Sequence, residues 1–412
     1  MQKKGYSLVG LMAVLALLLA ACGGGQAVPE ATMPAAVEPM ATDVASELPE
    51  IAATASDMAT MAAETAVPVT SGGQAQATAP AAATGTGAAP APAGFGETLA
   101  AVQARGNLVC GINGQLPGFS YLDPQGNYAG FDVDYCRAIA AAVLGDPNAV
   151  EFRATTTQER FTVLQTGEVD VLVRNTTWSL VRDTELGLNF TGVTFYDGQG
   201  IMVPADSGIT DLAGLAGGTI CVQKGTTTEL NLADVMATNG INYTPAVFDD
   251  VNATYGAYSE GRCDAVTSDK SQLSSVAKGV LSEPDAHMIM DVTLSKEPLG
   301  PAVRHGDDQW FDIVRWVGFA LVGAEEYGLT SENIGAAASD ENPEVRRFIG
   351  AEGDLGLKLG LENDWAVRVI EAVGNYEEVY NRNLGEGTPT FIPRGLNSLY
   401  TDGGVLYAPP FR

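Results

Sequence analysis

Histidine and basic residues are scarce in this chain of 412 residues. It has two histidines, His287 and His305, and 22 lysines and arginines against 50 aspartates and glutamates, so its formal net charge is −28 at pH 7. A zinc site built on histidine is therefore not expected. The acidic balance, without a basic aromatic patch, argues against nucleic acid as a partner.

The polar motifs described below also lack a nucleophile paired with a base. Both histidines lie outside these motifs, so no imidazole is available there as a general acid or base. Lys224-Gly225-Thr226 superficially suggests a phosphate loop, but a Walker A loop needs Gly-Lys-Ser/Thr, and here the lysine precedes the glycine. We expect no enzyme, no nucleotide site, no cofactor and no metal.

The first 22 residues are typical of an export signal. Lys3 and Lys4 precede an apolar run over residues 6–21, which is shorter than the roughly 20 residues of a transmembrane helix. The run ends in Leu-Ala-Ala-Cys22, which resembles the bacterial lipobox, whose cysteine is acylated and becomes the new N-terminus. Residues 1–22 are thus predicted to be a lipoprotein signal peptide, with an ordinary signal peptide and a chance cysteine as the alternative. The mature protein would be extracytoplasmic and anchored to the cell membrane by a lipid on Cys22.

Residues 23–94 differ in composition from the rest. Up to about Ala93 the segment is rich in Ala, Thr, Pro, Gly and Ser, and it has seven acidic residues, no lysine or arginine and no aromatic residue. Such a chain cannot bury enough apolar surface to offset its ordering entropy. We expect a disordered tether.

The remaining residues, about 320, are enough for two domains and alternate strand and helix patterns. The first series of expected elements is 107–112, 131–144, 150–153, 161–166 and 169–173. The second is 219–222, 228–237, 244–248, 253–260 and 264–267, followed by a helix at 308–322. Two βαβ series predict two parallel-sheet α/β lobes.

Residues 95–197 and 298–412 are assigned to lobe 1 and residues 198–297 to lobe 2. Two loop-like crossings, near 196–200 and 294–299, would form the hinge.

Polar residues follow several of these strands, where open α/β sheets place ligands. Asn175 and Thr177 follow one strand, Thr226 and Thr227 start the helix after another, and Asp269 follows a third. A helix N-terminus suits a carboxylate because its amides are unpaired. Each residue has a plain alternative role: an N-cap for Thr226 or Thr227, and a turn former for Asp269.

Three further residues complete the predicted site. Arg182 offers a guanidinium, although it could also be a solvated helix residue. Leu116 and Phe119 offer an apolar wall for a carbon skeleton. A guanidinium and hydroxyls for a carboxylate, together with a carboxylate for an ammonium, describe a site for a free amino acid.

The chain also resembles the periplasmic solute-binding proteins of polar amino-acid ABC importers. This resemblance implies a two-lobed type II fold with the ligand cleft between the lobes. The shared features are Gly130-Phe131-Asp132-Val133-Asp134, the turn Gly225-Thr226-Thr227-Thr228-Glu229, and Gly261-Arg262-Cys263-Asp264 leading to Asp269. It is most similar to the general L-amino-acid binding proteins, through the motifs at 174–178, 373–376, 383–387, 394–397 and 407–410. The similarity runs from about Gly96 to Arg412.

The resemblance implies roles for the predicted residues. Arg182 would pair with the ligand α-carboxylate, aided by Thr177 and Thr227. Asp269 would take the α-ammonium, with Asn175 near it. Many members place an aromatic residue where this chain has Leu116, with Phe119 three residues later. A less exacting wall fits broad specificity.

The expected function is capture of free L-amino acids by lobe closure and delivery to the permease of an ABC transporter. Two other classes stay open. One is an enzyme on the same fold, such as a dehydratase or a cell-wall hydrolase domain. The other is a sensor module, against which stands the absence of a transmembrane or signalling segment before the end at Arg412.

Four cysteines follow Cys22, and an even number in an exported protein favours disulfides. Cys110 is expected to bond Cys136, which lies on the apolar stripe of the next helix. Cys221 and Cys263 each lie six residues before a predicted ligand residue, which would put them at the same height on neighbouring strands. Four buried free thiols are the alternative.

Overall fold

The computed structural model describes residues 96–412. The predicted signal peptide, the lipid attachment site at Cys22 and the tether at 23–94 lie outside the described residues. Within 96–412, no helix combines the length and apolar character needed to cross a membrane.

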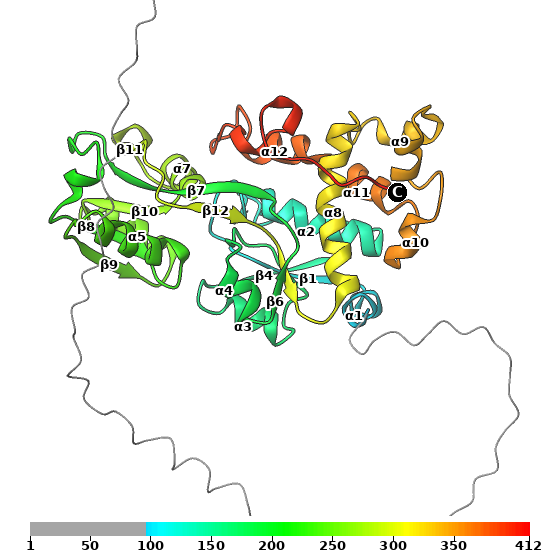
Figure 1. Ribbon diagram of the computed structural model, residues 1–412, viewed down its shortest axis with the longest axis horizontal. Coiled ribbons are helices and arrows are strands. Elements are labelled where there is room, and N and C mark those ends of the chain that lie inside the picture. Colours follow the sequence, from blue (N-terminus) through cyan, green and yellow to red (C-terminus); the bar gives the residue numbers. More distant parts are fainter. Residues whose placement is uncertain (1–95) are drawn as a thin grey trace, which may run out of the picture. The chain divides into compact units, whose positions relative to one another are not determined.

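One sheet forms the centre of the part that we call lobe 1 (Figure 1). β1 (Leu108–Ile112) pairs in parallel with β4 (Val150–Ala154) and β5 (Val171–Leu172). β13 (Ala302–Arg304) then pairs antiparallel with β5 and with β6 (Leu188–Phe190). Apolar side chains from β1, β5 and β13 are buried, so this sheet forms part of the hydrophobic core.

Helices enclose the sheet of lobe 1. α2 (Phe131–Leu144) is buried along nearly its whole length and packs against α11 (Trp365–Val373) and α8 (Asp308–Glu326). It begins at Gly130, whose φ is +126° and whose position would bring a Cβ within 2.2 Å of the Phe119 carbonyl oxygen. Only glycine fits this close approach.

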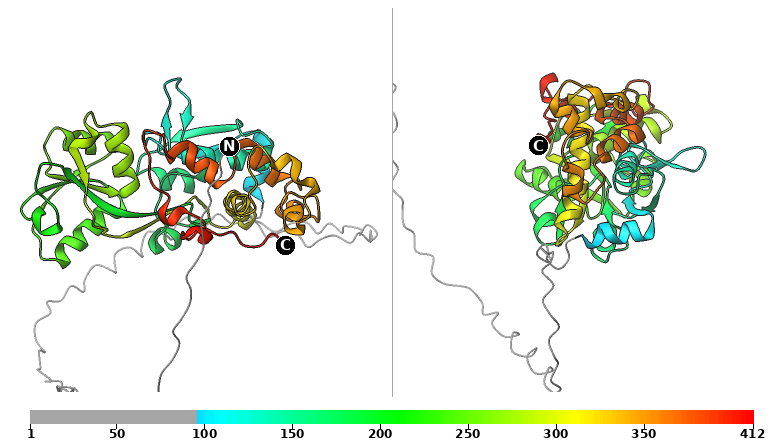
Figure 2. Two further views of the ribbon diagram at one scale, coloured as in Figure 1. Left: turned by 90° about the horizontal axis from the view of Figure 1, so that it is seen from above. Right: turned by 90° about the vertical axis from the view of Figure 1, so that its right-hand side faces the viewer.

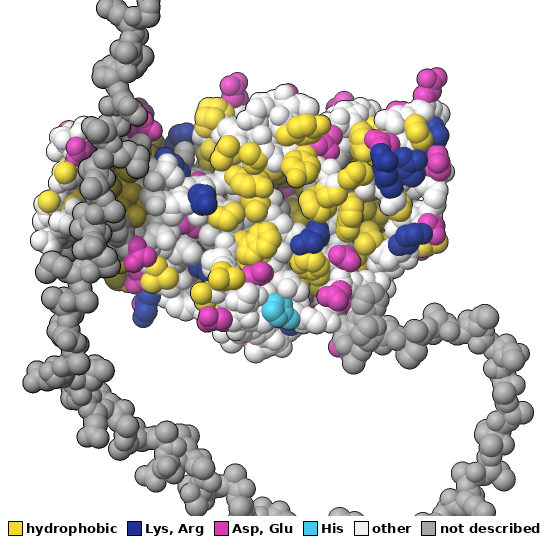
Figure 3. Space-filling view, in the orientation of Figure 1, with side chains coloured by type: hydrophobic (Ala, Val, Ile, Leu, Met, Phe, Trp, Pro, Cys, Tyr) yellow, Lys and Arg dark blue, Asp and Glu magenta, His cyan; other side chains and the backbone are white. Residues whose placement is uncertain are grey.

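The other elements of lobe 1 are shorter. The hairpin consists of β2 (Tyr121–Leu122) and β3 (Tyr128–Ala129). The remaining helices are α1 (Glu97–Arg105), α3 (Arg160–Gln165), α4 (Leu180–Thr184), η3 (Ile334–Ser339), α9 (Pro343–Phe348), α10 (Leu355–Leu359), α12 (Tyr376–Leu384), η4 (Gly395–Asn397) and η5 (Tyr400–Asp402). Hydrophobic side chains are numerous on the face over α8 and the C-terminal segment (Figure 3).

A second sheet forms the centre of lobe 2. β8 (Thr219–Gln223) pairs in parallel with β9 (Thr244–Phe248) and β10 (Ala265–Asp269). β7 (Phe195–Pro204) pairs antiparallel with β10 and with β11 (His287–Ile289). The helices of lobe 2 are α5 (Thr227–Thr238), α6 (Val251–Ser259), α7 (Lys270–Gly279), η1 (Leu212–Leu215) and η2 (Pro284–Ala286). Lobe 2 and the helices α9 and α10 lie at opposite ends of the described region (Figure 2).

Two strands connect the lobes. β7 pairs antiparallel with β12 (Lys296–Leu299), with Lys296 opposite Gly198 and Leu299 opposite Phe195. The predicted crossing at 196–200 therefore lies within a strand, and residues 296–299 of the crossing at 294–299 form another. We propose that this ribbon is the hinge and that the lobe boundaries lie within it, at 197/198 and 297/298.

The prediction of two α/β lobes is confirmed, but the expectation of purely parallel sheets is wrong. Both sheets are mixed because the chain crosses between lobes and returns. β7 enters the second sheet antiparallel to β10, and β13 enters the first antiparallel to β5. A βαβ pattern reports the parallel core of each sheet and says nothing of such returning strands.

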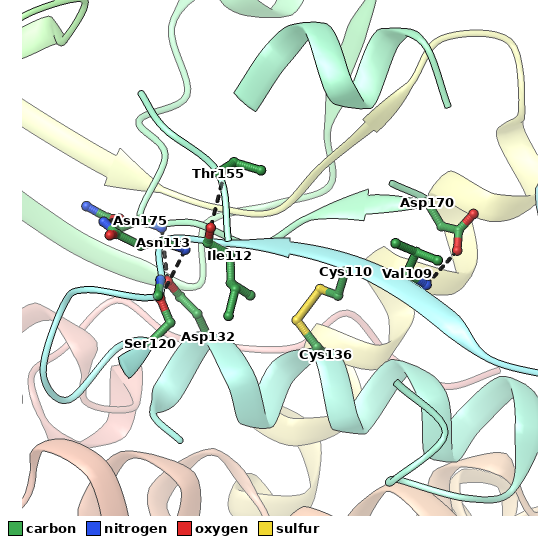
Figure 4. Close-up of a disulfide and its surroundings, with 11 residues drawn as sticks. Val109, Cys110, Ile112, Asn113, Ser120, Asp132, Cys136, Thr155, Asp170 and Asn175 are labelled. Atoms are coloured by element: carbon green, nitrogen blue, oxygen red, sulfur yellow. Dashed lines mark hydrogen bonds between the residues drawn. A yellow bond between two sulfur atoms is a disulfide. The ribbon is translucent and has the colours of Figure 1, made fainter. Parts of the chain in front are cut away.

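Both predicted disulfides are present. Cys110 on β1 bonds Cys136 on α2, with Cα atoms 6.2 Å apart (Figure 4). Cys221 bonds Cys263, with Cα atoms 5.7 Å apart. The expectation that Cys221 and Cys263 lie at the same height on neighbouring strands is wrong. Cys221 on β8 lies opposite Val266, and Cys263 precedes β10.

Candidate functional site

A polar cavity lies between the lobes. Its walls come from both, and they include three arginines, one aspartate and several hydroxyl and amide side chains. The lining residues are Asn113, Thr157, Arg160, Arg174, Asn175, Thr177, Arg182, Gln223, Thr226, Thr227, Thr228, Ser268, Asp269 and Gln272. Six of the eight predicted ligand residues are in this set, so the structure brings together the residues that follow different strands.

Arg182 lies on α4, the short helix after β5, and is 8% exposed. The helix begins at Ser179, whose hydroxyl is 3.5 Å from the Arg182 amide. The guanidinium donates one hydrogen bond to the Thr177 carbonyl oxygen, at 2.9 Å, and lies 5.3 Å from the centre of the Phe161 ring. A buried, oriented cation at the cavity wall suits an anionic group, and Arg182 is not the solvated residue that the alternative reading expects.

Asn175 has a special backbone conformation. Its φ is +27°, the one positive value among the non-glycine residues of 96–412. Such a backbone persists only where its surroundings hold it. The buried Asp132 carboxylate accepts from the Asn175 amide at 3.0 Å, and Asn113 donates to the Asn175 side-chain oxygen at 3.1 Å (Figure 4). The Asn175 side-chain nitrogen lies 3.4 Å from Gln272 of lobe 2, so this residue contacts both lobes.

Burial raises the pKa of Asp132 to about 7, although the Asn175 amide and the Arg174 guanidinium act in the opposite direction. Asp132 is on α2, at the place where the sequence motif 130–134 begins that helix. The motif at 130–134 therefore has a structural role, because its Asp132 holds the backbone of Asn175 in place.

Thr226 and Thr227 lie at the start of α5. Thr226 is the N-cap, since its hydroxyl accepts from the Glu229 amide at 3.0 Å and donates to the Gln223 carbonyl oxygen at 2.7 Å. Its hydroxyl hydrogen is thus used within the turn, although the residue still lines the cavity. Thr227 is the first helical residue, and the first turn leaves amide groups without partners inside the helix.

Asp269 ends β10 and is 6% exposed. It precedes α7, and its side chain accepts no capping hydrogen bond from the first turn of that helix. Burial raises the pKa of Asp269 well above its usual range, and the charges of Asp197 and Glu297 act in the same direction. Arg182 and Arg160 lower this pKa without compensating. A cation placed against Asp269 would relieve this cost.

Two arginines of the cavity were not foreseen. Arg160 is 3% exposed, its Nε has no hydrogen-bond partner within 96–412, and burial together with the charges of Arg174 and Arg182 lowers its pKa well below the usual range. Arg174 donates to the Thr155 carbonyl oxygen at 3.1 Å, and its pKa is lowered by burial to about 10. The sequence contained one indication that Arg160 is buried. Val163 and Leu164 follow it at i+3 and i+4, so it shares their apolar face of the helix.

Leu116 and Phe119 do not reach the cavity. Both are fully buried, and Phe119 packs edge-on against Phe131 and Phe195, with ring centres 6.2 and 5.2 Å apart. Neither lines the space between the lobes, so the structure shows them as core residues instead of a ligand wall. An apolar run looks the same in sequence whether it faces a ligand or the core.

A larger groove, next to α8 and the C-terminal segment, is a weaker candidate. Its only charged lining residue is Arg315, which donates to the Thr191 carbonyl oxygen at 3.0 Å and stacks over Phe311 at 4.0 Å. No carboxylate lines it, so it offers no opposite charge to an ammonium. Within 96–412 there is also no group of three acidic, cysteine or histidine residues that could hold a metal ion.

Comparison with known protein families gives one match that spans most of both lobes. The model of the bacterial extracellular solute-binding proteins, family 3, matches residues 108–332. All the residues that line the polar cavity lie inside this range.

Two curated relatives are similar over nearly their whole length. The general L-amino acid-binding periplasmic protein AapJ of Rhizobium johnstonii is 53% identical over 317 residues, which cover 76% of this chain and 93% of the relative. The glutamate/glutamine/aspartate/asparagine-binding protein BztA of Rhodobacter capsulatus is 52% identical over 316 residues, with the same two coverages.

A solved structure supports the same architecture. The periplasmic binding protein of an ABC transporter from Brucella ovis, with glutathione bound, has a TM-score of 0.75 and 49% sequence identity. The match covers 76% of this chain and 99% of that one. The predicted two-lobed type II fold is thereby confirmed.

Proposed function

We propose a function from one premise: the chain belongs to the bacterial extracellular solute-binding proteins, family 3. It captures free L-amino acids between its lobes and delivers them to the permease of an ABC transporter. AapJ and BztA, the relatives described above, are amino-acid-binding proteins by name.

The observation that carries this proposal is the pair of opposite charges in one cavity. Arg182 and Asp269 both line it, and both are buried. An amino acid carries a carboxylate and an ammonium on one carbon atom, so it can pair with both side chains at once. A ligand with one of these groups would leave a buried charge without a partner, which is costly.

The two charges come from different lobes. Arg182 belongs to lobe 1 and Asp269 to lobe 2, and Thr177 and Thr227 are divided in the same way. A ligand that pairs with both charges stabilises the closed arrangement more than the open one, and this difference in affinity drives closure. The ribbon of β7 and β12 would bend during this motion.

Arg160 supports a wide range of side chains that includes acidic and amide groups. Its buried Nε has no hydrogen-bond partner in the described region, and its guanidinium lies 4.7 Å from the centre of the Phe161 ring. Polar side chains of an amino-acid ligand, such as carboxylates and amides, can accept from it. This agrees with the amino acids in the name of BztA.

Calorimetric titration tests the proposal. Several chemically different L-amino acids should bind, whereas amines and carboxylic acids that lack the other group should not. Glutathione belongs in the panel, because its glutamyl end carries the same α-amino acid group and it is bound in the Brucella ovis protein. Absence of heat with every L-amino acid would contradict the function, and binding of a single amino acid would contradict general specificity.

We also propose that Cys22 carries a lipid. The sequence Leu-Ala-Ala-Cys22 supports this assignment. Full-length protein expressed in a bacterial host should partition into detergent on phase separation with Triton X-114, and Cys22→Ser should move it to the aqueous phase. Aqueous partition of the unmodified protein would contradict the anchor.

A further inference from the structure

Glu297 lies on β12, between the lobes, and is 1% exposed. Its Oε2 accepts from the Thr177 hydroxyl at 2.6 Å and from the Thr227 hydroxyl at 2.9 Å. Its Oε1 accepts from the Asn231 amide at 2.9 Å and from the Ser295 hydroxyl. One buried carboxylate thus holds a hydroxyl of lobe 1 and three polar groups of lobe 2.

The threonine hydroxyls have one hydrogen each, and this limits what they can do. Both hydrogens are directed to Glu297. The two hydroxyl oxygens are 3.3 Å apart, but no hydrogen remains for a bond between them. The contact between Thr177 and Thr227 across the cleft therefore depends on the carboxylate that both donate to.

We propose that Glu297 is a positioning residue that joins the two lobes through Thr177 and Thr227. It stabilises the closed arrangement whether or not a ligand is bound, and it turns both hydroxyls so that they present lone pairs to the cleft. The α-carboxylate of a ligand then depends on Arg182 for its pairing. Only the part that concerns ligand kinetics rests on the proposed function.

The surroundings of Glu297 fit a bridging role. Hydrogen bonds to a charged acceptor are stronger than those between neutral groups, and they strengthen in a buried setting. Asn231 lies on α5 outside the cavity lining, so the bridge includes a residue that no ligand in the cavity needs to touch.

Three variants separate this bridge from simple filling of space. Glu297→Met keeps the side-chain length but removes the acceptors. Glu297→Gln keeps the shape, and its amide can donate to the two hydroxyls, so it should restore part of the bridge. Asn231→Ala removes one of the groups that hold the carboxylate. Glu332→Gln, at an exposed position, is the matched control.

The kinetic test uses stopped-flow tryptophan fluorescence with L-glutamate and L-glutamine as probes. Glu297→Met should raise the dissociation rate constant about tenfold, with the association rate constant within twofold of wild type, because a bridge between closed lobes acts on release. Asn231→Ala should raise it about threefold. The dissociation rate constant of Glu297→Gln should lie between those of Glu297→Met and wild type, and that of Glu332→Gln should equal the wild-type value.

The second test needs no ligand. Small-angle X-ray scattering should give a larger radius of gyration for Glu297→Met than for wild type in the absence of amino acid. Should the wild type bind no L-amino acid, the proposed function fails while this comparison still decides the role of Glu297. Equal radii, or a dissociation rate constant for Glu297→Met within twofold of wild type, would overturn the bridge. Urea unfolding verifies that each variant is folded, and Asn231→Ala provides the kinetic test if Glu297→Met is not.

Discussion

Arg182 and Asp269 show how burial makes the charge of a single side chain sensitive to a bound ligand. Both are less than a tenth exposed and line the same cavity. Each pKa is shifted by burial toward the uncharged form, downward for Arg182 and upward for Asp269. A zwitterionic ligand would reverse both effects at once, which makes these residues the most sensitive points of the site.

The first prediction concerns Arg182→Ala. Loss of one partner of a buried charge pair costs roughly 2–5 kcal/mol, so the affinity for an L-amino acid should fall about 30-fold or more. Isothermal titration with L-glutamine measures this, and Arg412→Ala at the exposed C-terminus is the control. An affinity within threefold of wild type would remove Arg182 from the ligand site.

The second prediction concerns the pH dependence of binding. Burial, Asp197 and Glu297 raise the pKa of Asp269 in the protein without ligand, whereas a ligand ammonium favours the ionised form and lowers this pKa. Binding should therefore release a proton, and affinity should fall as the pH drops below the pKa of the free protein. Titrations in buffers of different ionisation enthalpy measure the released proton, and Asp269→Asn should abolish it. Proton uptake on binding would contradict this assignment.

Asp197 belongs to the same group of charges, because burial raises its pKa to about 6 while its carboxylate accepts from the Ser271 amide at 3.2 Å. Asp197→Asn is therefore the appropriate second control. It should change the pH midpoint of affinity without abolishing the released proton.

The third prediction concerns the ligand side chain. Arg160→Met should weaken binding of L-glutamate by about tenfold or more and binding of L-alanine by much less, because hydrogen bonds to charged groups are worth about 1.5–3 kcal/mol. The measurement is the ratio of the two dissociation constants. Equal losses for the two ligands would mean that Arg160 acts on the amino-acid head group or on the fold.

At the scale of elements, the disulfide of lobe 2 links the chain before β10 to β8. The closed loop spans 42 residues of sequence separation and includes α5, β9 and α6. Cross-linking such a loop reduces the entropy of the unfolded chain, and typical stabilisation is about 2–4 kcal/mol.

The fourth prediction follows from this loop. The double variant Cys221→Ala/Cys263→Ala should lower the free energy of unfolding by about 2–4 kcal/mol in urea, measured without reductant. The same change in wild type on adding reductant would support the assignment to the disulfides. If the urea midpoint of the double variant equals that of wild type, the packing of β8 and β10 stabilises lobe 2 without the disulfide.

At the scale of the whole molecule, the residues after the family match return to the strands that connect the lobes. Asn397 in η4 is buried, accepts from the Tyr196 amide at 2.7 Å and donates to the Tyr196 carbonyl oxygen at 3.1 Å. Lys278 of lobe 2 donates to the Phe391 carbonyl oxygen at 2.5 Å. The C-terminal segment thus contacts both β7 and lobe 2.

The fifth prediction concerns this contact. Asn397→Ala leaves both backbone groups of Tyr196 without their partner, and an unsatisfied buried polar group costs about 1–3 kcal/mol. The free energy of unfolding should fall by about 2 kcal/mol or more, measured by urea denaturation. Asn381→Ala, at an exposed position of α12, is the control. An equal effect of the two variants would mean that the contact with β7 contributes nothing specific.

The sequence by itself determined the elements with strong local patterns. The helix predicted at 131–144 and the strand predicted at 244–248 have the bounds that the structure shows. In the helix, the hydrophobic period and the flanking Gly130 and Gly145 agree with the tertiary packing. The same reasoning selected Asn175, Thr177, Thr227 and Asp269, which all line the cavity, because each lies at the carboxyl end of a strand in its own lobe.

Only the tertiary structure decided what lies across from these residues. Arg160 and Arg174 line the cavity, Leu116 and Phe119 lie in the core, and Glu297 connects the lobes. A sequence pattern reports which face of an element is apolar, but it does not report which element packs on that face. The contacts that define the cleft join residues up to 120 positions apart, such as Thr177 and Glu297, so they exist only once both lobes are folded.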